Sequence, residues 1–430
     1  MPSFRRSASD AHLTRRHCLA AALGAAALPS ARASAAQPDL TVAAFPLVDE
    51  IVRDLISDWK TTRPGVDVKL ISRQYDDHHT AMTTALSTSG FLPDVIALEA
   101  SYMGRFAFGK GLDSLSTPAF GAERYRDDFV PFAFEQARNR DGAIIAMPTD
   151  IGPGTLFYRQ DLLAKAGLQP DDLTRSWEAY VDAGARIKAA TGAYLIGHAR
   201  IVKDIVLRDG VAPGDGLYFD AHNRPQLTSQ RFVRAFELAA RVRREGLDAQ
   251  VETWYNDWAE NLKRGRLATE MSGAWMTGQM ANWVAPNTAG LWRVAQLPGA
   301  TFASYGGTYY AIPRRSAPER KALAWSLIQE LTLNRRRQLS TFKQQDSFPA
   351  LLAAQDDAFF DEPVPFLGGQ RARRLWRDAA RNINVVKLHK QNKFAEEVVS
   401  GELDNVLAYG KPIPQALADA QALLVHRANR

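Results

Sequence analysis

The sequence predicts an α/β protein of two lobes joined at a hinge, and three observations lead to this prediction. The chain has 430 residues, more than one hydrophobic core comfortably organises, so two lobes of roughly 150 to 200 residues each are expected. Its first part alternates strand and helix patterns. The stretch 143–167 then holds two short apolar strands with prolines and glycines between them, followed by a helix. We interpret this stretch as a hinge beside a ligand cleft.

The first part of the chain reads as strand, helix, strand, helix, strand. The strands are expected at 41–45, 66–72 and 94–99, and the helices at 48–60 and 76–87. This order favours a parallel sheet with helices on its faces. Ligands of such sheets collect beyond the carboxyl ends of the strands. Phe45 and Glu99 occupy those ends and are the first candidates for a binding site.

The hinge stretch combines buried strands with special backbone positions. Residues 144–147 and 155–158 read as the two strands, and residues 161–166 open the helix. Pro148, Gly152, Pro153 and Gly154 fix or free the backbone between them. Asp150 is left at the junction as a polar group.

The rest of the chain is predicted to be rich in helices, with a few strands that carry aromatic residues and glycines at their ends. A strand at 267–271 leads to Trp275, another is expected at 292–297, and a third follows the turn Tyr305-Gly306-Gly307. Helices are expected at 177–190, 201–208, 231–244, 276–283, 318–332, 394–407 and 413–425.

The charge of the chain is concentrated at its N-terminus. The formal net charge is +6, but residues 1–35 contain five arginines and one acid, so only about +2 belongs to the remainder. With 46% hydrophobic and 23% charged residues the chain has the composition of an ordinary globular protein. A nucleic-acid partner is therefore not expected, and Arg335-Arg336-Arg337 is interpreted as a solvated segment.

Residues 1–35 are predicted to be a twin-arginine export signal that is cleaved, which places the mature protein in the periplasm. Arg15-Arg16 precede the alanine-rich apolar run 19–28, and small residues at 31–35 offer cleavage sites. A membrane anchor would need about 20 apolar residues, roughly twice this run. Cys18 is the only cysteine, so the mature chain is expected to have neither disulfides nor a cysteine-based metal site.

Two acids and a group of aromatic residues are the strongest site candidates. Glu99 and Asp150 each end a strand beside irregular backbone, and they either accept hydrogen bonds from ligand hydroxyls or form the carboxylate pair of a glycoside hydrolase. Trp254, Tyr255, Trp258 and Trp275 could stack on a ligand, and their clustering on loops and strand ends favours this role for Trp254 and Trp275. Trp177, Trp325 and Trp376 lie in helical patterns and are expected in the core.

Other motifs receive structural interpretations. Tyr309 and Tyr310 could serve as oxygen ligands of ferric iron, but strand alternation is expected to send them to opposite faces. His78 and His79 are expected at the surface. The stretch 152–154 is too short for a phosphate loop and no lysine follows it, and the sequence contains neither a Gly-x-Ser-x-Gly nor a His-Glu-x-x-His motif.

Several segments together resemble the family 1 extracellular solute-binding proteins, the maltose-binding-protein-like receptors of bacterial ABC sugar importers. These segments follow the family's order over nearly the whole mature chain: 75–80, 92–99, Met147-Pro148-Thr149-Asp150, 156–163, 176–178, Ser272-Gly273-Ala274-Trp275, Tyr305-Gly306-Gly307 and Ala311-Ile312-Pro313. The stretch 151–154 departs from the pattern by being stiffer than the family's.

The resemblance implies a two-lobed periplasmic-binding-protein-like fold of type II, in which each lobe is a mixed sheet flanked by helices and crossing hinge strands join the lobes. It implies an N-terminal lobe of residues 36–150 and 296–332 and a C-terminal lobe of residues 151–295 and 333–430. A neutral oligosaccharide or polyol is the expected ligand, and the permease subunits of an inner-membrane ABC transporter are the expected partners of a monomer without cofactor or enzymatic activity. The expected ligand-binding residues are Phe45, Glu99, Asp150, Trp254, Tyr255, Trp275, Tyr305, Gly306 and Gly307.

Overall fold

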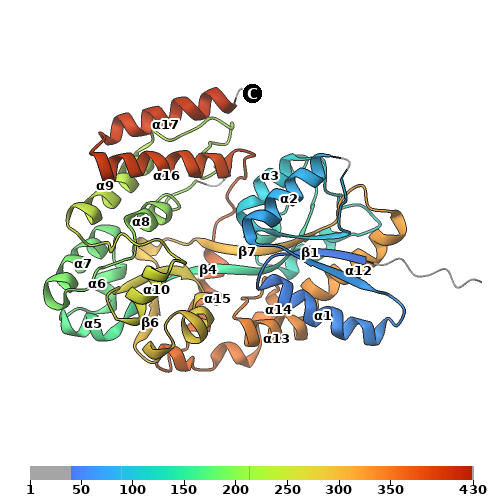
Figure 1. Ribbon diagram of the computed structural model, residues 1–430, viewed down its shortest axis with the longest axis horizontal. Coiled ribbons are helices and arrows are strands. Elements are labelled where there is room, and N and C mark those ends of the chain that lie inside the picture. The colour runs from blue at the N-terminus through green and yellow to red at the C-terminus, as the bar shows by residue number, and fades with distance from the viewer. Residues whose placement is uncertain (1–39, 89, 213, 429–430) are drawn as a thin grey trace, which may run out of the picture. The chain divides into compact units, whose positions relative to one another are not determined.

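The computed structural model describes residues 40–428 except residues 89 and 213 (Figure 1). The predicted export signal, residues 1–35, lies outside the described residues. The strands are β1 Leu40–Ala44, β2 Val68–Ser72, β3 Val95–Glu99, β4 Met147–Arg159, β5 Thr269–Gly273, β6 Trp292–Ala295 and β7 Ser304–Ala311. The helices are α1 Val48–Thr62, α2 Tyr75–Ser87, α3 Met103–Phe108, α4 Pro131–Glu135, α5 Gln160–Lys165, α6 Pro170–Thr174, α7 Trp177–Thr191, α8 Ala199–Val206, α9 Gln230–Arg244, α10 Asn256–Lys263, α11 Met276–Gln279, α12 Pro318–Thr332, α13 Arg335–Gln345, α14 Leu352–Gln355, α15 Ala372–Asn382, α16 Asn392–Tyr409 and α17 Ile413–Ala428.

The sheet is mixed, and its strand order is β2-β1-β3-β7-β4-β5, with β6 paired to β4. β1 pairs in parallel with both β2 and β3, which confirms the predicted βαβαβ unit. β7 then runs antiparallel to β3, although it follows it by about two hundred residues of chain. The α/β class and the mixed sheet flanked by helices are therefore as predicted.

The prediction of two short strands separated by a break in the hinge stretch is wrong, because β4 is one strand of 13 residues. Its first half pairs with β7, and its second half pairs with β5 on one side and β6 on the other. The pairing with β7 shifts register between Pro148 and Asp150 and again between Ile151 and Pro153. A proline cannot donate a ladder hydrogen bond, and these irregularities let the strand continue past both prolines.

Two hydrophobic cores lie on either side of this long strand. The first core gathers residues of β1, β3, α1, α12 and α15, and the second gathers residues of α7, α8, α9, α16 and α17. Figure 1 shows β1, α1 and α12 on one side and α7, α8, α9, α16 and α17 on the other, with β4 and β7 between them and α15 beside β4. Phe342, Phe348, Phe360 and Trp376 belong to the first core. The residue boundaries of the lobes stay a prediction.

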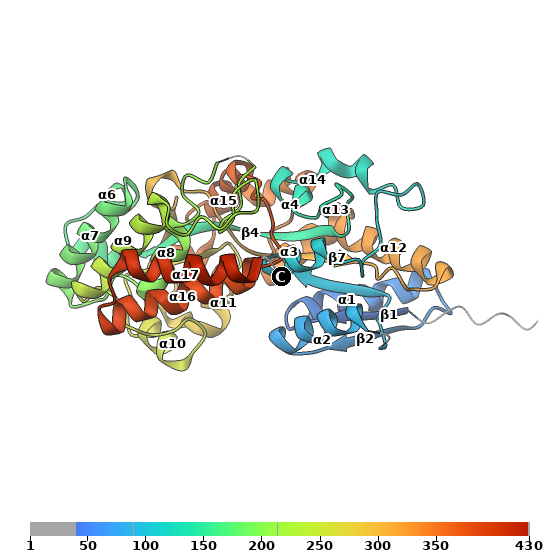
Figure 2. The ribbon, with the colours of Figure 1, turned by 90° about the horizontal axis from the view of Figure 1, so that it is seen from above.

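The helices form where apolar spacing and end signals agree. In α7 the side chain of Ser176 accepts a hydrogen bond from the Ala179 N–H at 3.0 Å, and Gly192 ends the helix in the left-handed conformation. Trp177 is buried at its start, as are Trp325 in α12 and Trp376 in α15, so the core prediction for all three is confirmed. α16 and α17 lie side by side in both views (Figures 1 and 2). Among the described residues, no helix combines the length and apolar character that crossing a membrane requires.

Candidate functional site

Glu99 ends β3 with one carboxylate oxygen engaged and the other directed toward β7. Its Oε2 accepts hydrogen bonds from the Tyr75 hydroxyl and the Ser101 N–H, each at 2.8 Å, and a further one from the Ser101 hydroxyl. A Cβ atom built on Gly306 would lie 3.7 Å from Oε1. Burial raises the pKa of Glu99 above its ordinary value, while these donors oppose the rise. The carboxylate therefore offers a fixed acceptor beside Gly306.

Two histidines of α2 contact the backbone of β3 next to Glu99, and the prediction that they lie at the surface is wrong. His78 and His79 are both completely buried, because α2 packs this face against β3. The His79 Nε2 accepts the Glu99 N–H at 3.1 Å, and its Nδ1 lies 2.8 Å from the Tyr75 carbonyl oxygen. These contacts assign the proton to Nδ1. Burial lowers the pKa of His79 to about 4, so the ring is neutral at physiological pH.

Phe45 packs against the aromatic side chains beneath Glu99 and does not line the cavity, contrary to the prediction. It follows β1 and is buried, with its ring centroid 5.5 Å from that of Tyr75 and 5.2 Å from that of His79. Tyr102 stacks on the other side of His79, with centroids 4.0 Å apart and planes 12° apart. The structure thus places Phe45 where it holds the groups that position Glu99.

Asp150 lies on β4, two strands away from Glu99. Both acids pair with Thr308 of β7, Glu99 from one side and Asp150 from the other. Residues opposite one another in a ladder point to the same face, and two strand spacings put their Cα atoms about 10 Å apart. Burial, followed by the nearby charge of Glu99, raises the pKa of Asp150 to about 6. Its Oδ1 is buried without a hydrogen-bond partner among the described residues.

Tryptophans form a stacked group on the other side of Gly306. The rings of Trp254 and Trp275 stack with centroids 5.7 Å apart and planes 21° apart, and Trp258 supports Trp254 at 5.4 Å. The Trp275 indole N–H donates to the Tyr305 carbonyl oxygen at 2.8 Å. Trp254 is 57% exposed and has a φ of 76°, a left-handed conformation that is unfavourable for a bulky residue. Tyr255 is exposed at the start of α10 and joins no aromatic contact among the described residues.

The turn at Gly306 and Gly307 brings the acids and the tryptophans together. Their φ values of 82° and 134° lie where residues with side chains are rarely found. A Cβ on Gly306 would lie 3.7 Å from Glu99 Oε1 and 4.0 Å from the Trp275 indole nitrogen, and one on Gly307 would lie 2.9 Å from the Asp150 carbonyl oxygen. Glycine therefore allows three predicted site segments to meet at one point.

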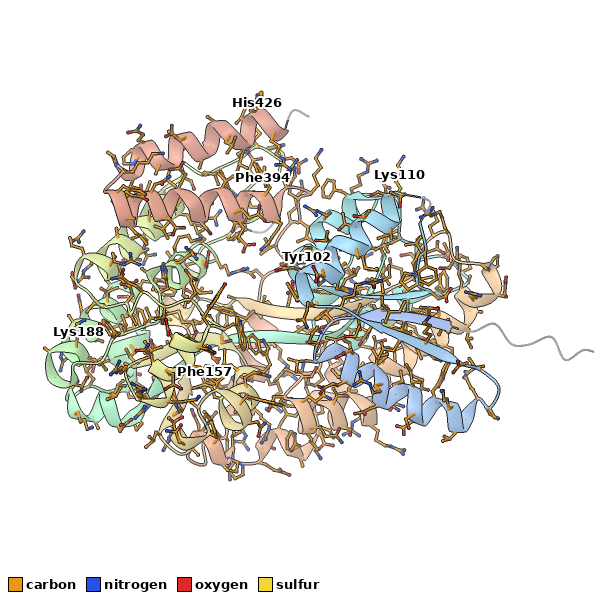
Figure 3. All side chains as sticks on the ribbon, in the orientation of Figure 1. Tyr102, Lys110, Phe157, Lys188, Phe394 and His426 are labelled. Atoms are coloured by element: carbon orange, nitrogen blue, oxygen red, sulfur yellow. The ribbon has the colours of Figure 1, made fainter. Side chains whose placement is uncertain are left out.

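A cavity of about 150 Å³, partly open to solvent, lies beside this meeting point. Glu99 and Ser101 line it from the β3 side, Ser304 and Gly306 from β7, and Arg208 from the end of α8. Its further polar lining residues are Gln136, Tyr218, Asn384, Asn392, Lys393 and Glu396. Figure 3 labels Tyr102, next to Ser101, and Phe394, next to Lys393, and shows them on the two bodies that face one another across this region.

The sequence prediction missed the part of the lining that comes from the segment after α8 and from α16. Arg208, Tyr218, Lys393 and Glu396 carry no local motif, and only tertiary packing brings them beside Glu99. The segment 383–391, which connects α15 to α16, was also missed. Its His389 lies 3.8 Å from Phe219 and 5.7 Å from Phe108, measured between ring centroids.

The two tyrosines considered as iron ligands are buried in β7. Tyr309 donates to the Gln136 side-chain oxygen at 3.3 Å, and Tyr310 is completely buried with no partner for its hydroxyl among the described residues. Neighbouring strand residues point to opposite faces. Within the described ranges, no group of three or more His, Cys, Asp or Glu side chains is placed to hold a metal ion.

Long strands that connect two separate cores beside a polar cavity define the class of two-lobed α/β binding proteins. The model of one family, bacterial extracellular solute-binding protein, matches residues 46–335, and the chain belongs to this family. It is similar to the lactose-binding protein of Rhizobium radiobacter, with 24% identity over 85% of this chain and 87% of that protein. It also resembles the arabinooligosaccharide-binding protein of Bacillus subtilis (strain 168), with 22% identity over 63% of this chain and 64% of that protein.

Solved structures show the same fold. A family 1 extracellular solute-binding protein covers 91% of this chain and 100% of its own, with a TM-score of 0.79 and 24% identity. The ABC transporter associated binding protein from B. animalis subsp. lactis Bl-04, solved in complex with beta-1,6-galactobiose, gives a TM-score of 0.74 with 21% identity, covering 91% of this chain and 97% of that one. The predicted two-lobed fold is therefore confirmed.

Proposed function

We propose that this chain is the sugar-binding component of a bacterial ABC importer and that it binds an oligosaccharide in the cavity beside Gly306. Family membership and relatives that bind lactose and arabinooligosaccharides support the proposal. The observation that carries it is the meeting of Glu99 Oε1 and the Trp275 indole at Gly306. A fixed carboxylate beside stacked tryptophans suits a ligand that has both hydroxyls and flat apolar ring faces.

The proposed roles follow from these positions. Glu99 and Asp150 accept hydrogen bonds from sugar hydroxyls, and Trp275 and Trp254 offer ring faces for stacking. The turn 305–307 lets the sugar approach the backbone closely. Tyr255, which is 70% exposed, is proposed to contact a longer ligand. Phe45 is proposed to act indirectly by holding Tyr75 and His79.

Binding is proposed to favour a closed arrangement of two lobes, residues 36–150 with 296–332 and residues 151–295 with 333–430. A ligand shifts this equilibrium only if it gains contacts with both lobes in the closed form. The exported monomer, with its signal of residues 1–35 removed, would then present the closed form to the permease in the inner membrane. Delivery to a permease is what the relatives' assignment to ABC transporters supports.

We propose binding without turnover. The family consists of solute-binding proteins, and Oε2 of Glu99 is occupied by its own donors. A glycoside hydrolase using Glu99 and Asp150 would release reducing sugar from bound oligosaccharide. Stoichiometric binding with no product released would exclude that alternative.

The proposal is tested by calorimetry and thermal shift with lactose, arabinooligosaccharides and polyols. A ligand at 100 times its dissociation constant stabilises the native state by about 2.7 kcal/mol. Trp275→Ala should weaken binding of any sugar found in this screen by about 2 kcal/mol, roughly 30-fold. The substitution removes the indole face and its hydrogen bond to the Tyr305 carbonyl oxygen. Trp283→Ala is the matched control, because Trp283 is 74% exposed and outside the stacked group. Equal losses in both variants, or none, would contradict the site.

A further inference from the structure

Arg208 lines the cavity with a guanidinium group that the protein leaves without an acceptor. It follows the last turn of α8, and its backbone N–H donates to the Ile205 carbonyl oxygen at 2.9 Å. The side-chain Nε is buried and has no hydrogen-bond partner among the described residues. No carboxylate of the described chain forms an ion pair with this group within 4.0 Å. An unpaired buried donor on a cation is costly unless a ligand supplies the acceptor.

The acids near Arg208 are already engaged by other residues. Asp204, one turn earlier, forms an ion pair with Lys203 at 2.5 Å. Across the cavity, Glu396 pairs with Lys393 at 3.3 Å. Glu99 directs Oε2 to Tyr75 and Ser101 rather than to the α8 side of the cavity. Among the described residues, the Arg208 guanidinium therefore has neither an ion-pair partner nor a hydrogen-bond acceptor in this lining.

The backbone around Arg208 is held in place by a second arginine. Arg231 of α9 donates to the Leu207 carbonyl oxygen, and it donates to the Leu217 carbonyl oxygen at 2.9 Å. These carbonyls belong to the residues next to Arg208 and Tyr218, so one guanidinium fixes both parts of this wall. Burial raises the pKa of Tyr218 well above its ordinary value, so its hydroxyl keeps its proton and can donate.

We propose that Arg208, with Tyr218 beside it, binds a carboxylate of the ligand, so that the saccharide taken up is an acidic one that carries a uronic or aldonic acid residue. The planar guanidinium can donate two parallel hydrogen bonds to a carboxylate, while Glu99 and Trp275 at the Gly306 end bind hydroxyls and a ring face. This inference rests on the proposed function and narrows it, because the sequence alone led us to expect a neutral ligand.

The test measures affinities of the full exported chain for a galacturonic acid disaccharide, lactose and glucose 6-phosphate. Wild type should bind the galacturonate at least about 10-fold more tightly than lactose. Arg208→Gln should weaken galacturonate binding by about 10- to 100-fold, as expected for hydrogen bonds to a charged group, and should change lactose binding by less than about 3-fold. Arg186→Gln is the matched control, because it removes the same charge from an exposed residue. The one hydrogen bond that the Arg186 side chain makes within the described part of the chain goes to the Gly167 carbonyl oxygen, at 3.3 Å.

The outcomes separate this inference from the proposed function. Binding of lactose with no preference for galacturonate, or equal effects of Arg208→Gln on both sugars, would overturn the acidic ligand and leave a sugar receptor. Preference for glucose 6-phosphate would overturn the carboxylate in favour of a phosphate. Failure of every saccharide, with a correctly folded protein, would overturn the proposed function itself. Arg208→Lys keeps the charge but loses the planar fork, and it should recover only part of the galacturonate affinity.

Discussion

A buried carboxylic acid beneath the tryptophan group makes stability depend on pH. Glu270 of β5 is 1% exposed and accepts a hydrogen bond from the Trp258 indole N–H at 2.9 Å. Burial raises its pKa from 4.5 to about 7. The native state therefore binds this proton more tightly than the unfolded state does, and ionisation of Glu270 opposes folding. Its contribution is fully retained below pH 4.5 and is progressively lost as the pH rises to about 7.

Glu270→Gln should remove this pH dependence. With pKa values of 4.5 unfolded and about 7 folded, ionisation costs the wild type about 2 to 3 kcal/mol more at pH 8 than at pH 5. Any packing or hydrogen-bond cost of the amide is the same at both pH values and cancels in this comparison. The variant should therefore gain about 2 to 3 kcal/mol relative to wild type between pH 5 and pH 8.

The measurement is urea unfolding of both proteins at pH 5 and pH 8, followed by tryptophan fluorescence. Glu237→Gln is the control, because Glu237 of α9 is exposed and should give the same difference from wild type at both pH values. If the difference between Glu270→Gln and wild type is also independent of pH, the buried acid is ionised in the native state and the reasoning is refuted.

Two further substitutions test the turn and the connection between α15 and α16. Gly306→Ala should lower sugar affinity at least about 10-fold, because a side chain at φ 82° is strained and enters the space between Glu99 and Trp275. Gly410→Ala is the control, because Gly410 has a φ of 68° and open space around it. This variant should lose a similar amount of stability and keep its sugar affinity. A loss of affinity in Gly410→Ala as large as that in Gly306→Ala would contradict a role of Gly306 in binding. His389→Ala should destabilise the protein by about 1 to 3 kcal/mol and increase the radius of gyration in solution scattering, since contacts to Phe108 and Phe219 are lost. Lys390→Ala is the control: Lys390 is exposed, and its replacement should change neither the stability nor the radius of gyration. Equal scattering curves for wild type and His389→Ala would contradict the role of His389 in holding this connection.

The sequence predicted the elements whose signals are local. Helix α12 has the predicted bounds, and α1, α7 and α9 differ by one or two residues, because apolar spacing and end signals agree there. The parallel unit β1-β2-β3 followed from the alternation of strands and helices. β4 did not follow, because Pro148 and Pro153 indicate a break unless the register shifts that accommodate them are known.

Part of the site was predictable from local sequence, and the part that tertiary packing decides was not. Glu99 ends β3 as predicted, whereas the prediction that Asp150 ends a strand is wrong, because it lies inside β4. Glu99 and Asp150 end up opposite the same residue of β7, and Trp254 and Trp275 stack, which gives geometric support to predictions that binding has yet to test. The burial of His79 could not be read from its own sequence context. It depends on α2 packing against β3, which also creates an acceptor for the Glu99 N–H. Arg208 comes from a segment with no motif at all.

The strands that connect the two cores also carry residues of the candidate binding site. Asp150 lies between the two register shifts of β4, and Gly306 and Gly307 lie on the facing part of β7. Prolines interrupt the hydrogen-bond ladder with β7 on either side of Asp150. On the other edge of β4 the Ile151 N–H donates to the Phe348 carbonyl oxygen at 2.9 Å, and the Ala350 N–H donates to the Thr149 carbonyl oxygen at 3.0 Å. In the proposed function, a ligand that engages Asp150 and Glu99 contacts the strand segment that runs between the two cores. Ligand contacts at this segment would favour the proposed closed form directly, because the residues that bind the ligand also lie on the strands that connect the lobes.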